Sequence, residues 1–111
     1  MNNGPVPALS VVVPVYNEEQ SLPDLLEMLT GVLRTLPNAF EIILVNDGSG
    51  DNSWSTIEHI MPLNSAVRGI DLLRNYGQHN AVLCGIREAI YDVTVTIDEE
   101  KIFPDFPFTG T

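Results

Sequence analysis

The chain has 111 residues, a length that fits one domain of modest size, and its 44% hydrophobic and 18% charged residues exclude a disordered composition. Its 15 acidic and 5 basic residues give a formal net charge of -10, which argues against nucleic acid or an anionic membrane surface as the main partner. The single cysteine, Cys84, excludes an internal disulfide and suits a reducing compartment, so we expect a cytoplasmic protein. Residues 1–8 lack the features of a signal peptide, and no stretch approaches the length of a transmembrane helix.

The apolar pattern predicts four strands that alternate with three helices. Residues 41–45 (EIILV) form a short, mainly apolar run rich in β-branched side chains, which is typical of a central parallel strand. Residues 67–73 have an interrupted pattern that favours a sheet edge. The other strands are expected at residues 9–15 and 93–97, and the helices at residues 22–36, 52–60 and 80–91. This alternation predicts an α/β fold: a parallel, Rossmann-like sheet of about four strands with right-handed crossovers and helices on both faces.

Local signals refine the ends of these elements. Proline cannot donate to a sheet ladder, so Pro14 is expected to end or break the first strand. Ser21 and Asp24 resemble a capping box at the start of the first helix. Asp51 or Ser53 is expected to be the N-cap of the second helix.

The third helix carries a row of small residues. Ala81, Gly85 and Ala89 fall four apart, which predicts that this helix approaches the sheet closely. Cys84 lies next to the row and is interpreted as a small core residue. His59 is expected on the surface, and His79, at the start of this helix, is a cap, a surface group or a ligand contact.

Composition divides the chain into three parts. Residues 1–8 are expected to be a disordered N-terminus, and residues 9–100 form the domain. Residues 101–111 (KIFPDFPFTGT) have three phenylalanines, two prolines and no period, so they are interpreted as a tail.

Polar residues follow all four predicted strands, at residues 16–18, 46–49, 74–77 and 98–100. Carboxyl ends of parallel strands meet at one edge of a sheet, where ligands bind, so the pattern predicts a nucleotide-type pocket. A carboxylate at Asp47 can accept hydrogen bonds from a base or a ribose. The same turn is equally compatible with a simple strand-to-helix connection. Neither a G-x-G-x-x-G motif nor a P-loop motif is present.

The acidic run at residues 98–100 has two interpretations. Its carboxylate oxygens suit a hard divalent cation, with a diphosphate supplying further ligands. The alternative is a solvated acidic turn.

Together the four motifs resemble the N-terminal nucleotide-binding half of a family 2 glycosyltransferase with the GT-A fold. The last two are most similar to the branch that moves a sugar from a nucleotide to a polyprenyl phosphate, such as dolichyl-phosphate mannose synthases and undecaprenyl-phosphate aminoarabinose transferases. The resemblance covers residue 9 to about residue 100. The matching stretches are SVVVPVYNE (10–18), EIILVNDGSGD (41–51), RNYGQHNAVLCG (74–85) and VTIDEE (95–100).

The resemblance implies a donor site for a UDP- or GDP-linked sugar, a Mg²⁺ or Mn²⁺ ion and a polyprenyl phosphate acceptor at the cytoplasmic face of a membrane. It places Asp98 and Glu100 at the family's D-x-D positions, where they would hold the metal, and it places Asp47 at the base. The remaining residues that it assigns to the nucleotide-sugar site are Pro14, Tyr16, Asn17, Glu18, Gly48, Arg74, Asn75, Gly77 and Glu99.

The chain departs from the family pattern in three places. Asn46 stands where the family often has Asp, and Glu100 replaces the last Asp of D-x-D. Past the acidic motif the sequence gives way to residues 101–111, so we expect a truncated domain without the acceptor half.

The sequence leaves three functional hypotheses open. The first is a glycosyltransferase donor half that is unable to transfer by itself. The second is a non-catalytic fragment that binds a nucleotide weakly or pairs with another chain, with self-association through the uncovered sheet. The third is an unrelated signalling domain of flavodoxin-like type.

Overall fold

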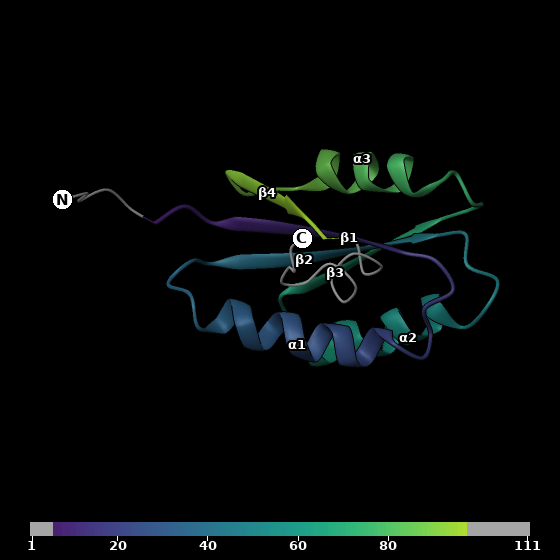
Figure 1. The fold of residues 1–111 in the computed structure, drawn as a ribbon, viewed down its shortest axis with the longest axis horizontal. Coiled ribbons are helices and arrows are strands. Elements are labelled where there is room, and N and C mark those ends of the chain that lie inside the picture. Colours follow the sequence, from purple (N-terminus) through teal and green to yellow (C-terminus); the bar gives the residue numbers. More distant parts are fainter. Residues whose placement is uncertain (1–5, 98–111) are drawn as a thin grey trace, which may run out of the picture.

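The computed structural model describes residues 6–97, which form a single parallel sheet flanked by helices (Figure 1). The element order confirms the predicted alternation of strands and helices. The elements are β1 (Leu9–Val15), α1 (Leu22–Arg34), β2 (Phe40–Asp47), α2 (Ser53–Ile60), the 3₁₀ helix η1 (Met61–Leu63), β3 (Val67–Leu72), α3 (Gln78–Glu88) and β4 (Val93–Thr96).

The strand order is β3-β2-β1-β4, and all three pairings are parallel. Helices α1 and α2 cover one face of the sheet and α3 covers the other (Figure 1). The predicted Rossmann-like α/β architecture is therefore confirmed, and β3 lies at an edge of the described sheet, as its interrupted pattern predicted. None of the helices within residues 6–97 has both the length and the hydropathy needed to cross a bilayer.

Each face of the sheet buries its own apolar cluster. Val11, Val13, Ile42 and Leu44 point toward α1 and α2, while Val12, Ile43 and Val45 pack under α3. Alternate residues of a strand face opposite sides, so a continuous apolar run is what a doubly covered strand requires. The leucines of α1 fill the first cluster: Leu22, Leu25, Leu26, Leu29 and Leu33 are all buried.

The C-terminal end of α1 differs from the prediction. The helix ends at Arg34 rather than near residue 36, and Leu36 is exposed. The Thr35 hydroxyl donates to the Val32 carbonyl at 2.6 Å, and the Leu36 N–H donates to the Leu33 carbonyl. These bonds tighten the last turn and end the helix. The apolar spacing of the sequence, in contrast, continues to Leu36, so spacing alone overestimates the length of the helix.

Helix α3 approaches the sheet as closely as its small residues predicted. A Cβ added at Gly85 would lie 2.4 Å from Val12 Cγ1 and 3.1 Å from Val45 Cγ2, so a side chain at this position has no room. Ala81 is fully buried, and Cys84 packs against the same cluster. Ala89, however, lies outside the helix, because the helix begins at Gln78 and ends at Glu88 instead of spanning residues 80–91.

The predicted bounds of β1, residues 9–15, are confirmed, but Pro14 does not break the strand. Pro14 pairs with Val45, and the strand continues to Val15. The Ile97 N–H donates to the Val12 carbonyl, so every second residue of β1, including Pro14, turns its polar groups toward β4. The register of β4 ends opposite Val12, and the missing N–H of Pro14 therefore removes no described ladder bond.

Both capping predictions are also corrected. The Ser21 hydroxyl does not cap α1; it donates to Glu18 Oε1 at 2.8 Å. The N-cap residue of α2 is Asn52, without a side-chain cap bond, rather than Asp51 or Ser53. The Asp51 carboxylate nevertheless accepts the Ser53 N–H at 2.9 Å, so it satisfies a donor of the first turn from one position further out.

Strand β4 is the least covered element of the sheet. All four of its residues are exposed, including Val93 at 39% and Val95 at 40%. Its single described neighbour is β1. Residues 98–111, which include the predicted acidic cluster and tail, lie outside the described residues.

Candidate functional site

The turns that follow β1 and β2 are bonded to each other. The Asn17 N–H donates to Ser49 Oγ at 2.9 Å, and the Gly50 N–H donates to Asn17 Oδ1 at 2.7 Å. Asn17 holds a left-handed conformation with φ 54°, which Asn tolerates better than most residues. The sequence places short polar side chains here because they can bond to backbone groups that leave a strand without a partner.

A second tie links the same two turns through Asp51. Its carboxylate accepts the Glu19 N–H at 3.2 Å and the Ser53 hydroxyl at 2.6 Å, and Ser53 Oγ in turn accepts the Glu18 N–H at 2.9 Å. Desolvation raises the pKa of Asp51, but the bonds from Ser53 and from the Glu19 N–H outweigh it and hold the pKa below its usual value. The loop before α2 is therefore fixed to the loop before α1.

Asp47 joins the β2 turn to the loop that follows β3. It is only 2% exposed, and its Oδ1 accepts the Tyr76 N–H at 2.8 Å. The Asn75 side-chain amide donates to the Asp47 carbonyl at 3.2 Å. Gly48, with φ +65°, lies so close that an added Cβ would be 2.3 Å from the Arg74 carbonyl carbon and the Asn75 nitrogen. Because these contacts connect all three strand ends, the edge is one continuous surface.

Two aromatic side chains and a cation stand out on this surface. Tyr16 and Tyr76 are each 49% exposed. The Arg74 guanidinium carbon lies 5.8 Å from the centre of the Tyr76 ring, within cation–π range. An aromatic ring offers a flat face to a base, and a guanidinium is suited to a phosphate.

The structure thus brings together most of the residues predicted for the site. They come from three adjacent turns, after β1, β2 and β3: Tyr16, Asn17, Glu18, Asp47, Gly48, Arg74, Asn75 and Gly77, with Pro14 one residue before the end of β1. Asp98, Glu99 and Glu100 lie outside the described residues. Within residues 6–97 no group of three His, Cys, Asp or Glu side chains could hold a metal ion.

Sequence reasoning missed the polar residues that hold these turns in place. Ser49 and Ser53 each accept a backbone N–H from the turn after β1, and Asn46 bonds to Ser49. The density of Ser, Asn and Asp between residues 46 and 53 was the available signal, but it carries no information about which partner each side chain takes.

At the opposite edge of the sheet, the buried Glu41 carboxylate is the centre of a cluster of hydrogen bonds and one ion pair. Glu41 Oε2 accepts hydrogen bonds from the Ser10 hydroxyl at 2.6 Å and from the Ile90 N–H at 3.0 Å. Glu41 Oε1 accepts a bond from Arg68 Nε at 2.9 Å. Desolvation raises the pKa of Glu41, but the bonds from Ile90, Ser10 and Arg68 and the Arg68 charge together hold the pKa below its usual value. Arg68 also donates to the Glu88 carbonyl and Ser10 Oγ accepts the Tyr91 N–H. This cluster fastens the end of α3 to three strands.

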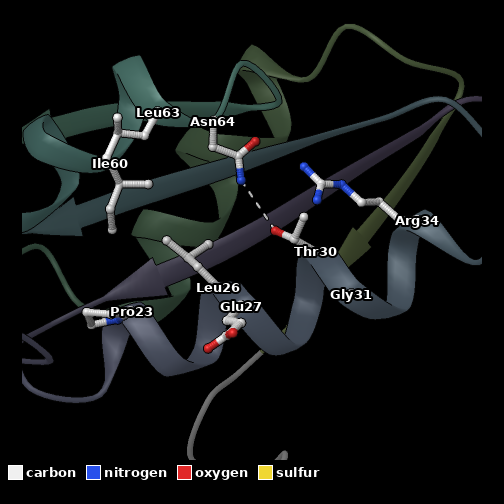
Figure 2. Close-up of a pocket in the computed structure, with 9 residues that line it drawn as sticks. All are labelled: Pro23, Leu26, Glu27, Thr30, Gly31, Arg34, Ile60, Leu63 and Asn64. Carbon is white, nitrogen blue, oxygen red and sulfur yellow. Dashed lines mark hydrogen bonds between the residues drawn. The ribbon is translucent and has the colours of Figure 1, made fainter.

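A pocket of about 420 Å³ lies elsewhere, between α1 and the α2–η1 segment (Figure 2). Leu26 and Ile60 contribute apolar side chains to its lining, and the Asn64 side-chain amide donates to Thr30 Oγ1 at 3.4 Å. None of the strand-end residues predicted for the site lines it, so it is separate from the edge described above. The lining residues are Pro23, Leu26, Glu27, Thr30, Gly31, Arg34, Ile60, Leu63 and Asn64.

Comparison with known proteins gives the family. The model of glycosyl transferase family 2 matches residues 10–105. The chain is 41% identical over 99 residues to undecaprenyl-phosphate 4-deoxy-4-formamido-L-arabinose transferases of Yersinia pestis (strain Pestoides F) and Yersinia pseudotuberculosis serotype I (strain IP32953). These matches cover 88% of this chain and 30% of each relative, so the chain spans about 30% of the length of the curated relatives it matches.

Solved structures confirm the predicted GT-A fold. A Pyrobaculum calidifontis mannosyltransferase, PcManGT, in complex with GDP-Man and Mn²⁺, matches with a TM-score of 0.67 and 22% identity over 83% of this chain and 27% of its own. The S. aureus TarS 1–349 structure matches with a TM-score of 0.69 and 23% identity over 84% of this chain and 27% of its own. At these identities the likeness supports the fold alone.

Proposed function

We propose, since the chain belongs to glycosyl transferase family 2, that the edge formed by its strand ends binds the nucleotide-diphosphate part of a sugar donor for transfer to a polyprenyl phosphate. The observation that carries the proposal is the locking of three polar turns into one surface at the carboxyl ends of β1, β2 and β3. Ligands of open parallel sheets bind at this edge. The similarity to undecaprenyl-phosphate sugar transferases supports the class of acceptor.

Different residues of the edge would bind different parts of the donor. The exposed ring of Tyr16 offers a surface for the base, and the carboxylate of Asp47, which is buried at the end of β2 and bonded to the Tyr76 N–H, would accept a hydrogen bond from it. Arg74, held over the Tyr76 ring, offers positive charge to the diphosphate in a chain of net charge -10. Asn17 and Gly48 fix the backbone on which these groups stand.

A divalent cation belongs to the proposal as the partner of the diphosphate. Asp98 and Glu100 would hold it, because carboxylate oxygens are the donors that Mg²⁺ and Mn²⁺ accept. When bound, such an ion neutralises charge that develops on the leaving diphosphate. The single cysteine suits a reducing setting, and we place the chain in the cytoplasm.

The test is a calorimetric titration of the full chain with UDP and with GDP, each with and without Mn²⁺. We expect saturable binding of one diphosphate that strengthens with the metal. Asp47→Asn should keep the Tyr76 N–H bond, because the amide retains an acceptor oxygen, yet weaken binding at least tenfold through loss of the charge. Asp92→Asn, an exposed residue in the turn before β4, makes the same charge change away from the site and should bind as wild type. A folded wild-type chain that binds neither diphosphate contradicts the proposal.

A second candidate function is a non-catalytic fragment that pairs with another copy of the chain. All four residues of β4 are exposed and β1 is its single neighbour within residues 6–97, which supports this candidate, since an edge strand offers unpaired backbone groups. Light scattering tests it: a dimer at micromolar concentration that dissociates in Val95→Lys favours pairing, and a monomer at all concentrations excludes it.

A further inference from the structure

Asn46 and Asp71 form a cross-strand pair, each one residue before the end of its strand. They are register partners on β2 and β3, and Asn46 Nδ2 donates to Asp71 Oδ1 at 2.9 Å. Asn46 is 3% exposed, whereas Asp71 stands at the edge and is exposed. Neither residue belongs to the set that the family resemblance assigns to the donor.

The pair continues into the site through a chain of hydrogen bonds. Asn46 Oδ1 accepts the Ser49 hydroxyl at 2.5 Å, and Ser49 Oγ accepts the Asn17 N–H at 2.9 Å. The direction of this chain is fixed at both ends. A backbone N–H can only donate, so Ser49 accepts from Asn17 and gives its own proton to Asn46. A carboxylate can only accept, so Asp71 requires the amide nitrogen of Asn46.

An amide is therefore the side chain that satisfies both neighbours of position 46 at once. A carboxylate there would keep the Ser49 bond but face Asp71 with a second acceptor at hydrogen-bond distance. Two carboxylates so placed repel each other unless they share a proton. We propose, building on the donor-site function above, that Asn46 is a positioning residue: paired with Asp71, it holds Ser49 and Asn17 in the arrangement that the nucleotide diphosphate needs, without taking part in a protonation equilibrium.

The adjoining segments carry other ionisable groups. They are Asp47 and Asp51 in the same loop, Glu18 and Glu19 in the turn after β1, and Arg74 after β3, while the first turn of α2 has no acidic residue. All of them are unchanged in the variants below, so a difference between variants isolates positions 46 and 71.

Three variants separate pairing from a general structural effect. Asp71→Asn keeps an acceptor oxygen for Asn46 and is the single-substitution reference for the double variant. Asn46→Asp should bind the preferred diphosphate about tenfold more weakly than wild type at pH 8, with a smaller deficit at pH 5, where the two carboxylates share a proton. The double variant N46D/D71N restores one donor and one acceptor with the direction reversed, so it should regain wild-type affinity at both pH values.

The experiment is calorimetry with UDP or GDP and Mn²⁺ at pH 5 and pH 8, each variant compared with wild type at the same pH. A pH-dependent deficit in N46D that the second substitution removes supports the proposal. An N46D protein that binds as wild type at pH 8, or a double variant no better than N46D, overturns it.

Thermal unfolding keeps this inference separate from the proposed function. If wild type binds neither diphosphate, the donor-site function fails, yet the pairing still makes a prediction about stability. The melting temperature of N46D, compared with wild type at the same pH, should be lower at pH 8 than at pH 5, and N46D/D71N should show no such difference. A further NMR comparison covers the case in which N46D fails to fold: the signal of the Asn46 side-chain amide should move from its wild-type position in Asp71→Ala, which removes the acceptor, and a signal that stays fixed refutes the pair.

Discussion

The ionic cluster around Glu41 gives the most quantitative prediction about stability. Glu41→Gln replaces one acceptor oxygen with an amide that donates, so one of the existing donors must lose its partner. The least unfavourable arrangement turns the new amide toward Arg68, whose side chain is 41% exposed and can reach water. Ser10 and Ile90 then bond to a neutral oxygen instead of a carboxylate.

The expected magnitude follows from these three changes. Weakening a charge-assisted bond to a neutral one costs about 1 kcal/mol each for Ser10 and Ile90. Loss of the Arg68 contact adds about 1 kcal/mol, because solvent screens an arginine that is 41% exposed. We expect Glu41→Gln to lower the free energy of unfolding at pH 7 by about 3 kcal/mol, a large share of the 5–15 kcal/mol typical of a domain.

The same cluster predicts a pH dependence. The folded pKa of Glu41 lies below its ordinary value of 4.5, so its stabilisation is complete above about 4.5 and is lost as the pH falls through the folded pKa. The deficit of Glu41→Gln should therefore shrink below pH 4.5.

Urea unfolding followed by the fluorescence of Trp54, the single tryptophan, measures this effect across pH. Glu58→Gln, an exposed residue on α2, is the matched control and should stay within about 0.5 kcal/mol of wild type. A Glu41→Gln protein as stable as this control at pH 7, or a deficit that does not change on acidification, would refute the reasoning.

Two further substitutions test close packing. Gly85→Ala places a methyl group 2.4 Å from Val12 Cγ1, so α3 must shift. We expect the free energy of unfolding, measured in urea, to fall by about 1–3 kcal/mol. Gly31→Ala is the control: an added Cβ there has nothing within 4 Å, so it should be neutral or stabilising. Gly48→Ala collides with the backbone of Arg74 and Asn75 at 2.3 Å and forces a side chain into φ +65°, so it should separate the turns after β2 and β3 and abolish diphosphate binding, as calorimetry would report.

The fold followed from the sequence because its strongest signals are periodic. A continuous run such as residues 42–45 can only be buried on both faces, and the leucine spacing of α1 leaves a single apolar stripe. Element ends were harder to predict. The end of α1 at Arg34 depends on the bond from the Thr35 hydroxyl to the Val32 carbonyl. Pro14 is tolerated within β1 because the pairing with β4 ends at Val12.

The site could be located from the sequence but not assembled from it. Strand order places the polar turns at one edge, so Asp47 and Tyr16 were expected there on topology alone. Their partners could not be predicted. Asn46 bonds to Ser49, 3 positions away in the sequence, and to Asp71, 25 positions away, and no sequence pattern indicates these pairs. The ion pair between the buried Glu41 and the partly exposed Arg68 was likewise not predicted, because a charge at the start of an apolar run usually faces water.

The central claim is that the strand-end edge, and not the pocket between α1 and α2, binds a nucleotide diphosphate. Two-dimensional ¹H–¹⁵N NMR of the labelled chain, titrated with UDP and GDP in the presence of Mg²⁺, tests it directly. The account predicts saturable shifts of the Asn17, Gly48 and Tyr76 amides while those of Thr30 and Asn64 stay unchanged. Shifts confined to the residues of the pocket, or no shifts at millimolar diphosphate in a folded chain, would contradict it.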